Sequence, residues 1–163
     1  LPAMTKPAHL ARVYELLEGA TPGDDTKISA SLEEVARRIR RRAIIVVISD
    51  LLDEPEDVLR ALAFFRHRGH DVIVLHAMDS SELTLEFRGT VAFEDLETEE
   101  TLSCEVADLR AGYLAELRQF LAECRHGCRD HSIDYALIDT SRPFDEALSA
   151  YLAHRRGVTT RRR

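Results

Sequence analysis

The sequence contains no tryptophan, only three cysteines and no long apolar run. A helix that spans a membrane needs about 20 mainly apolar residues, and the chain has no such stretch. Its first twenty residues also lack the apolar core of a secretory signal peptide. Because three cysteines do not suit a disulfide framework, we expect reduced thiols. These features predict a cytoplasmic protein without a membrane span.

Motifs of several enzyme classes are also missing. The chain has no GxGxxG motif, no Walker A motif and no GxSxG nucleophile elbow. Its formal net charge is −7, whereas a surface that binds nucleic acid is basic. Two basic runs, at 37–42 and 155–163, are interpreted as a solvated helix end and a polar tail. We therefore expect no nucleic-acid partner and no cofactor bound through these motifs.

Three short apolar runs predict the strands of a parallel sheet. They lie at 43–49, 71–77 and 133–139. The run at 43–49 is continuously apolar, as expected for a strand covered on both faces. Helical periodicity is found at 7–18, 29–42, 54–68, 106–130 and 141–155. The prediction is an α/β fold of three layers, with a mostly parallel, Rossmann-like sheet and helices on both faces.

The remaining segments complete the predicted domain. Apolar and polar side chains alternate in residues 82–104, and this pattern predicts a small antiparallel excursion from the parallel sheet. Three strands are few for such a sheet, so we expect that N-terminal strands of a larger domain are missing. A single partial domain is placed at 1–155, and the basic tail at 156–163 is expected to be disordered. The residues expected to face inward on the first and last helices are Leu10, Val13, Leu17, Leu148, Tyr151 and Leu152.

Acidic and hydroxyl side chains follow each predicted strand, where ligands bind in open parallel sheets. The strand ends carry Ser49-Asp50, His76 to Asp79, and Asp139 to Ser141. Such oxygen ligands suit a hard cation such as Mg²⁺. Each also has a purely structural interpretation: Asp53 with Glu56 as a capping box, His76 as a satisfied core residue, and Ser141 as a helix cap.

Cys124, Cys128 and His131 share a helical face, which could form a metal site, although a zinc site needs four ligands or three and a water. The two cysteines also continue an apolar stripe of the helix at 106–130. Free cysteine behaves as a small hydrophobic residue, so we interpret both as buried structural thiols.

Longer stretches resemble a known family. The segments "SDLLDEPE", "FFRHRGHDVIVLH" and "DYALIDTSRPFDEAL", within residues 8–155, resemble the C-terminal half of the bacterial domain-of-unknown-function family fifty-eight. The resemblance implies a von Willebrand factor A-like domain that holds Mg²⁺. On that pattern Thr26 matches a loop threonine and Asp50 the aspartate of the third metal-binding loop. The Asp-x-Ser-x-Ser loop is missing, so the implied site is incomplete and we expect no cofactor in this chain.

The resemblance also implies a function. Such relatives resemble partners of MoxR-type AAA+ ATPases in protein assembly or maturation, with a metal-ion-dependent adhesion site that catalyses nothing. We therefore expect a non-catalytic protein-interaction module. The alternative is a metal-dependent hydrolase or a receiver-like phosphoacceptor that uses Asp50. We also expect a homo-oligomer formed through the edge of strand 43–49, which holds no charge and no proline.

Overall fold

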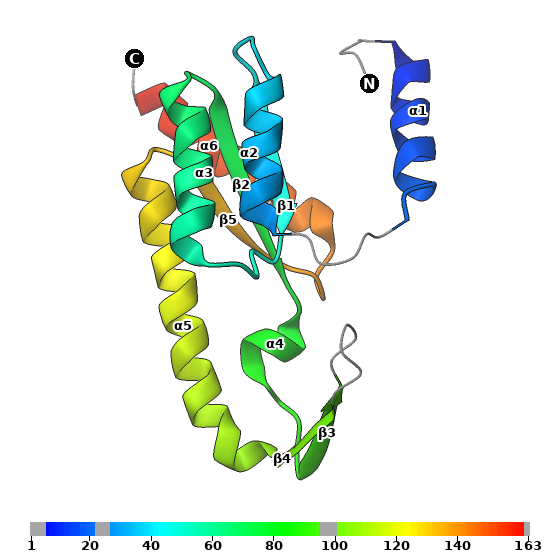
Figure 1. Cartoon of the computed structure of the whole chain (residues 1–163), viewed down its shortest axis with the longest axis vertical. Helices are drawn as coiled ribbons and strands as arrows, with labels where there is room; N and C mark the ends of the chain where they lie inside the picture. Colours follow the sequence, from blue (N-terminus) through cyan, green and yellow to red (C-terminus); the bar gives the residue numbers. More distant parts are fainter. Residues whose placement is uncertain (1–5, 22–26, 95–100, 162–163) are drawn as a thin grey trace.

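The fold is built around a parallel sheet of three strands (Figure 1). The computed structural model describes residues 6–21, 27–94 and 101–161. The strands are β1 (Ile44–Ser49), β2 (Asp71–Met78) and β5 (Asp134–Asp139), paired in the order β1-β2-β5. The α/β fold and all three predicted parallel strands are confirmed, with β2 in the centre and β1 at one edge.

Helices lie on both faces of the sheet (Figure 1). α2 (Ile28–Arg38), α3 (Pro55–His67) and α5 (Val106–Asp130) enclose the core against one face. The core residues include Leu32, Ala36, Ile45, Val47, Val58, Leu62, Phe65, Val72, Val74, Cys124 and Cys128. α6 (Phe144–Arg161) packs on β5 from the other face and includes residues 156–161 of the basic tail. Within the described part of the chain, no helix is long and apolar enough to cross a membrane.

Residues 79–118 are called the arm, and their described parts, 79–94 and 101–118, form an extension of the sheet and its helices (Figure 1). It consists of α4 (Ser80–Thr84), the antiparallel pair β3 (Thr90–Glu94) and β4 (Thr101–Glu105), and the first half of α5. The predicted antiparallel excursion is therefore confirmed. Its first residues are helical instead of extended, because Asp79 and Glu82 form a capping box that starts α4.

The prediction that the first strand is covered on both faces is wrong. Ile45 and Val47 face the core, whereas Ile44, Val46 and Ile48 on the other face of β1 are 62%, 51% and 71% exposed. The continuous apolar run therefore marks one buried face and one apolar face that the described residues leave open. We call this set of three side chains the β1 face.

Two helices also differ from their predicted packing. α1 (Pro7–Glu18) buries no residue, and Leu10 and Leu17 of its predicted inward face are exposed. On α6, Leu148 and Leu152 are exposed as well, and only Tyr151 is half-buried. Sequence periodicity identified these apolar stripes correctly but not whether a partner surface covers them.

Candidate functional site

The carboxyl ends of the three strands meet at one edge of the sheet. The strand register places Ser49 beside His76, and Met78 beside Asp139. Asp50, Asp79 and Asp139 therefore follow neighbouring strands at the edge where parallel sheets bind ligands. This confirms the predicted meeting of the strand ends and defines the candidate site.

Asp50 lies in a tightly folded loop after β1. Its Oδ1 accepts hydrogen bonds from the Leu52 N–H and the Ser49 hydroxyl, both at 3.3 Å. The Ser49 hydroxyl oxygen also accepts from the Leu51 N–H at 3.1 Å. Leu51 is almost fully buried yet has a φ of 57°, in the left-handed region that leucine rarely adopts. Burial of its side chain holds this strained turn, which presents Asp50 to solvent.

Asp53 does not cap the helix that follows it. α3 has Glu54 as its N-cap and no side-chain cap, so the predicted capping box of Asp53 and Glu56 is wrong. Instead, Asp53 Oδ2 accepts from the hydroxyl and the N–H of Ser29, at 2.7 and 3.1 Å, in the first turn of α2. The Ser29 hydroxyl is the largest cause that lowers the pKa of Asp53. The Asp53 carboxylate thus connects the loop before α3 to the N-terminus of α2 through hydrogen bonds.

Asp79 and Asp139 are both engaged with neighbouring hydroxyl groups. Asp79 accepts from the Ser81 N–H at 2.8 Å and the Thr140 hydroxyl at 3.2 Å. Asp139 accepts from the hydroxyl and the N–H of Ser141 at 2.6 and 2.9 Å. Because α6 begins at Phe144, Ser141 does not lie in the predicted N-cap position. The pKa of each carboxyl is lowered, chiefly by the hydrogen bond from Ser81 or Ser141. The Asp79 carboxylate therefore joins the turns after β2 and β5, whereas the Asp139 carboxylate stabilises the turn after β5 itself.

His76 is fully buried beneath this edge. Its Nδ1 lies 2.8 Å from the hydroxyl of Tyr135, and Phe120 packs edge-on against its ring. Burial lowers the pKa of His76, while the backbone and the charge of Asp50 oppose that effect. The imidazole is therefore a neutral core group at neutral pH, which agrees with its structural interpretation.

The two helical cysteines are buried in the core, as the apolar stripe predicted. Burial raises the pKa of the Cys124 thiol to about 11 and that of Cys128 to about 12. Both remain protonated at neutral pH and are poor metal ligands in that form. His131, the third member of the suspected metal set, is exposed.

The residues present do not fit a tightly held divalent cation. Thr26, one of the two predicted ligands, lies outside the described residues, and Asp50 is the other. Across residues 6–21, 27–94 and 101–161, no three His, Cys, Asp or Glu side chains are grouped closely enough to hold a metal ion. Mg²⁺ prefers six oxygen ligands, so Asp50 alone supplies too few from the protein.

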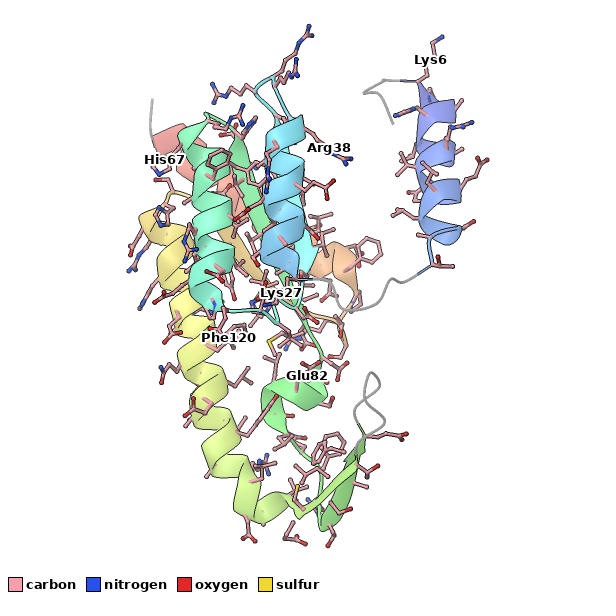
Figure 2. All side chains as sticks on the ribbon, in the orientation of Figure 1. Lys6, Lys27, Arg38, His67, Glu82 and Phe120 are labelled. Atoms are coloured by element: carbon pink, nitrogen blue, oxygen red, sulfur yellow. The ribbon has the colours of Figure 1, made fainter. Side chains whose placement is uncertain are left out.

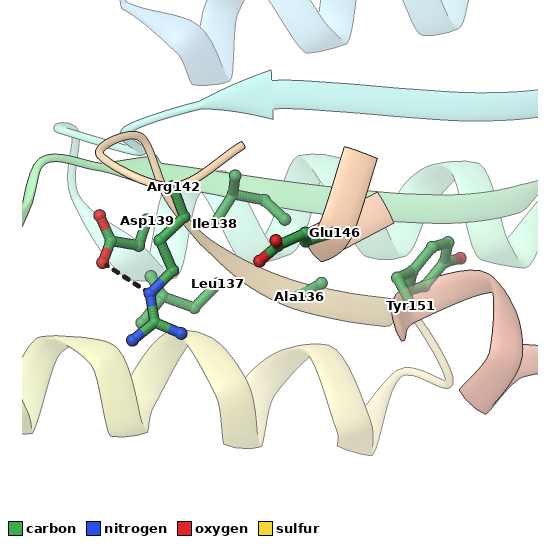
Figure 3. A pocket seen from close by; sticks show the side chains of 7 residues that line it. All are labelled: Ala136, Leu137, Ile138, Asp139, Arg142, Glu146 and Tyr151. Carbon is green, nitrogen blue, oxygen red and sulfur yellow. Dashed lines mark ion pairs between the residues drawn. The ribbon is translucent and has the colours of Figure 1, made fainter. Parts of the chain in front are cut away.

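An open pocket of about 470 Å³ lies between β5 and α6, and the sequence had not suggested it (Figure 3). Its lining residues are Ala136, Leu137, Ile138, Asp139, Arg142, Glu146 and Tyr151. Arg142 Nε lies 3.6 Å from Asp139 Oδ2, so the pocket mouth holds an ion pair. Nothing in the local sequence signals this pocket, because it arises where α6 covers the strand only partly.

Comparison with protein families provides the identification. The model of the family described as "Protein of unknown function DUF58" matches residues 1–122, which include β1, β2, the arm and about two thirds of α5. The chain belongs to the DUF58 family. The match covers Asp50 and Asp79 of the candidate site, whereas β5 and Asp139 lie beyond it. No curated protein and no solved structure matches the chain.

Proposed function

We propose that this DUF58 chain is a non-catalytic protein-interaction module that presents the arm to a basic surface of a partner protein. The observation that carries the proposal is the distribution of charge. Residues 79–118 contain eleven acidic and three basic side chains, a net charge of −8. The other residues contain 18 acidic and 19 basic side chains, a net charge of +1. The whole acidic excess of the protein therefore resides in the arm.

The arm also carries exposed apolar side chains among its charges. Phe87, Leu102 and Leu109 are 43%, 65% and 41% exposed. Apolar groups within a charged rim are the usual composition of a transient protein interface. In Figure 2, Arg38 lies toward the upper end of the molecule, whereas Glu82 of the arm lies in the lower half. Such a charge distribution favours oriented encounter with a basic partner.

A MoxR-type AAA+ ATPase is the partner class that we propose. The resemblance to von Willebrand factor A-like proteins supports this choice, and in a complete domain of that type Thr26 and Asp50 would join the missing loop around Mg²⁺. In this chain we expect binding of Mg²⁺ to be weak or absent. Calorimetry that gave a micromolar dissociation constant for Mg²⁺ would contradict the incomplete-site interpretation.

The test measures binding of the purified chain to a MoxR-type ATPase by biolayer interferometry at several salt concentrations. Neutralising Glu86, Glu94 and Glu105 to Gln is expected to weaken binding about tenfold and to reduce its salt dependence. The matched control neutralises three exposed acids outside the arm: Glu33, Glu56 and Glu123. If both triple variants weaken binding equally, or if the wild-type chain does not bind, the proposal fails.

The alternative is a receiver-like phosphoacceptor or a metal-dependent hydrolase that uses Asp50. One observation favours it: Asp50 is exposed on a strained turn at the ligand-binding edge of the sheet. Incubation with acetyl phosphate and Mg²⁺, followed by intact-mass spectrometry, tests the phosphoacceptor. We expect no added phosphate; a label that disappears in Asp50→Asn would favour the alternative.

The open edge of β1 leads to a second proposal, self-association. β1 is an edge strand in the described sheet, and residues 44–49 contain neither charge nor proline. An edge of this composition readily pairs with another strand. We propose that the β1 edges of two copies pair with each other, and light scattering that found only an 18.5 kDa monomer at micromolar concentration would refute this.

A further inference from the structure

Two apolar surfaces of this chain lack a partner among the described residues. One is the β1 face, formed by Ile44, Val46 and Ile48. The other is a stripe on α1 formed by Leu10, Val13, Tyr14 and Leu17, which follow the i, i+3, i+4, i+7 spacing of one helical face. We call it the α1 stripe. Parallel sheets are almost always covered on both faces, and a 12-residue helix is marginal alone in water. Each surface therefore requires a partner.

We propose that the α1 stripe of one copy packs on the β1 face of a second copy, and that the α1 stripe of the second copy packs on the β1 face of the first. The resulting dimer is a reciprocal helix exchange. It covers both apolar surfaces in a closed arrangement with two-fold symmetry. This inference is independent of the proposed partner function, because it uses neither the arm nor the carboxyl edge of the sheet.

The dimensions of the two surfaces agree. The 12 residues of α1 extend for about 18 Å, and the six residues of β1 for about 20 Å. Leu10, Tyr14 and Leu17 are each more than half exposed, like the three residues of the β1 face. At roughly 60–120 Å² of apolar area per side chain, the two reciprocal contacts bury on the order of 1,000 Å². That area approaches the range of specific interfaces, about 1,200–2,000 Å².

The position of α1 favours a second copy as the occupant. α1 stands apart from its own sheet, on the side of the open β1 edge (Figure 1). A second molecule approaching that edge therefore meets α1 and the β1 face together. Arg12 and Glu15 lie on the side of α1 opposite the stripe, so docking leaves both charges in water.

Disulfide trapping between two different variants tests the contact. In a Cys104→Ser background, one variant carries Leu17→Cys and the other Val46→Cys, while Cys124 and Cys128 remain buried. The two variants are mixed at micromolar concentration and oxidised mildly. We expect a disulfide-linked heterodimer that forms at least tenfold faster than with Arg12→Cys, the matched control on the opposite side of α1.

Light scattering supplies a second measurement that does not depend on cysteine. The double variant Leu10→Glu, Leu17→Glu is expected to become monomeric at a concentration where the wild type is a dimer. Arg12→Glu is the control and should remain dimeric. Neither change affects the core, because α1 buries no residue.

Three results would overturn the proposal. The first is equal trapping of Val46→Cys by the Leu17→Cys and Arg12→Cys variants. The second is a chain carrying both Leu17→Cys and Val46→Cys that closes a disulfide within a monomer, which would show that α1 covers its own β1 face. The third is a dimer that persists in the Leu10→Glu, Leu17→Glu variant, which would favour β1 edge pairing without helix exchange.

Discussion

At the scale of single residues, the most demanding group is His76, a polar side chain placed where the sheet is completely buried. Only its hydrogen bond with Tyr135 compensates for the loss of water at Nδ1. Nε2 has no hydrogen-bond partner among the described residues. The sequence predicted a structural histidine at the end of an apolar strand, but the identity of its partner, 59 residues away, depends on the pairing of β2 with β5.

Tyr135→Phe is expected to lower the free energy of unfolding by about 1–3 kcal/mol, since it leaves Nδ1 of a buried imidazole without a partner. His76→Leu should cost less, because it removes both polar nitrogens together with the need to satisfy them. Urea unfolding followed by circular dichroism measures both changes. A larger loss for His76→Leu than for Tyr135→Phe would show that packing of the ring matters more than its hydrogen bond.

Two glycines on α5 should respond in opposite ways to substitution. No heavy atom lies within 4 Å of a Cβ built on Gly112, so Gly112→Ala is expected to stabilise the protein by about 0.5–1 kcal/mol through helix propensity. At Gly127 a Cβ would lie 2.3 Å from Cδ1 of Leu59 on α3, so Gly127→Leu should destabilise by about 1–3 kcal/mol. Urea unfolding of the two variants checks the sign of each change. Stabilisation by Gly127→Leu would refute the close approach of α3 and α5.

At the scale of elements, the sequence predicts the positions of most strands and helices, with α4 as an exception, but it does not predict which of their apolar faces are covered. The apolar runs placed β1, β2 and β5 within a residue or two. The apolar run of β1 predicts coverage on both faces, because an apolar residue at a partner interface and one in a core look alike in sequence. The local sequence predicts Asp53 as a helix cap, because its observed partner, Ser29, lies 24 residues earlier and becomes adjacent only when α2 packs on α3.

Asp53 joins two elements, and its contribution should depend on pH. Its folded pKa lies below the ordinary value of 3.8, so the carboxylate stabilises the fold above that pH. This stabilisation is lost as the pH falls through the folded pKa. Asp53→Asn should therefore lower Tm by a few degrees at pH 7. The difference in Tm between this variant and the wild type should become smaller as the pH falls into the acid range.

The matched control for this experiment is Glu56→Gln, which alters the other member of the predicted capping box. The structure gives Glu56 an exposed position in the first turn of α3 and no capping role. Its substitution should change Tm little at any pH. If Glu56→Gln and Asp53→Asn lower Tm equally in thermal denaturation at pH 7, the result would support the capping box and contradict the role of the Ser29 contact.

At the scale of the whole molecule, the arm has much less apolar support than the sheet and its helices. Among its described residues, Leu85 and Val106 are the buried apolar side chains, and Phe87 packs edge-on with Phe93. The core beneath the sheet, in contrast, includes 14 buried side chains from α2, α3, α5, the strands and the turns that flank β1 and β5. Regions with few buried contacts open at lower free energy than the core. The arm and the sheet core should therefore be separate cooperative units, although α5 passes through both.

Native-state hydrogen exchange along α5 tests this division within one helix. Amides of residues 108–117, in the arm, are expected to exchange at least tenfold faster than those of 120–130, which pack on the core. If the arm opens as a unit, the amides of β3 and β4 will share the opening free energy of residues 108–117, and Gly112→Ala will slow exchange in the arm alone. Simple fraying would instead produce a gradual change in exchange rate along α5, and the amides of β3 and β4 would not share one opening free energy. Uniform protection from 108 to 130 would show that the arm and the sheet core unfold together, and the arm would then be a rigid extension.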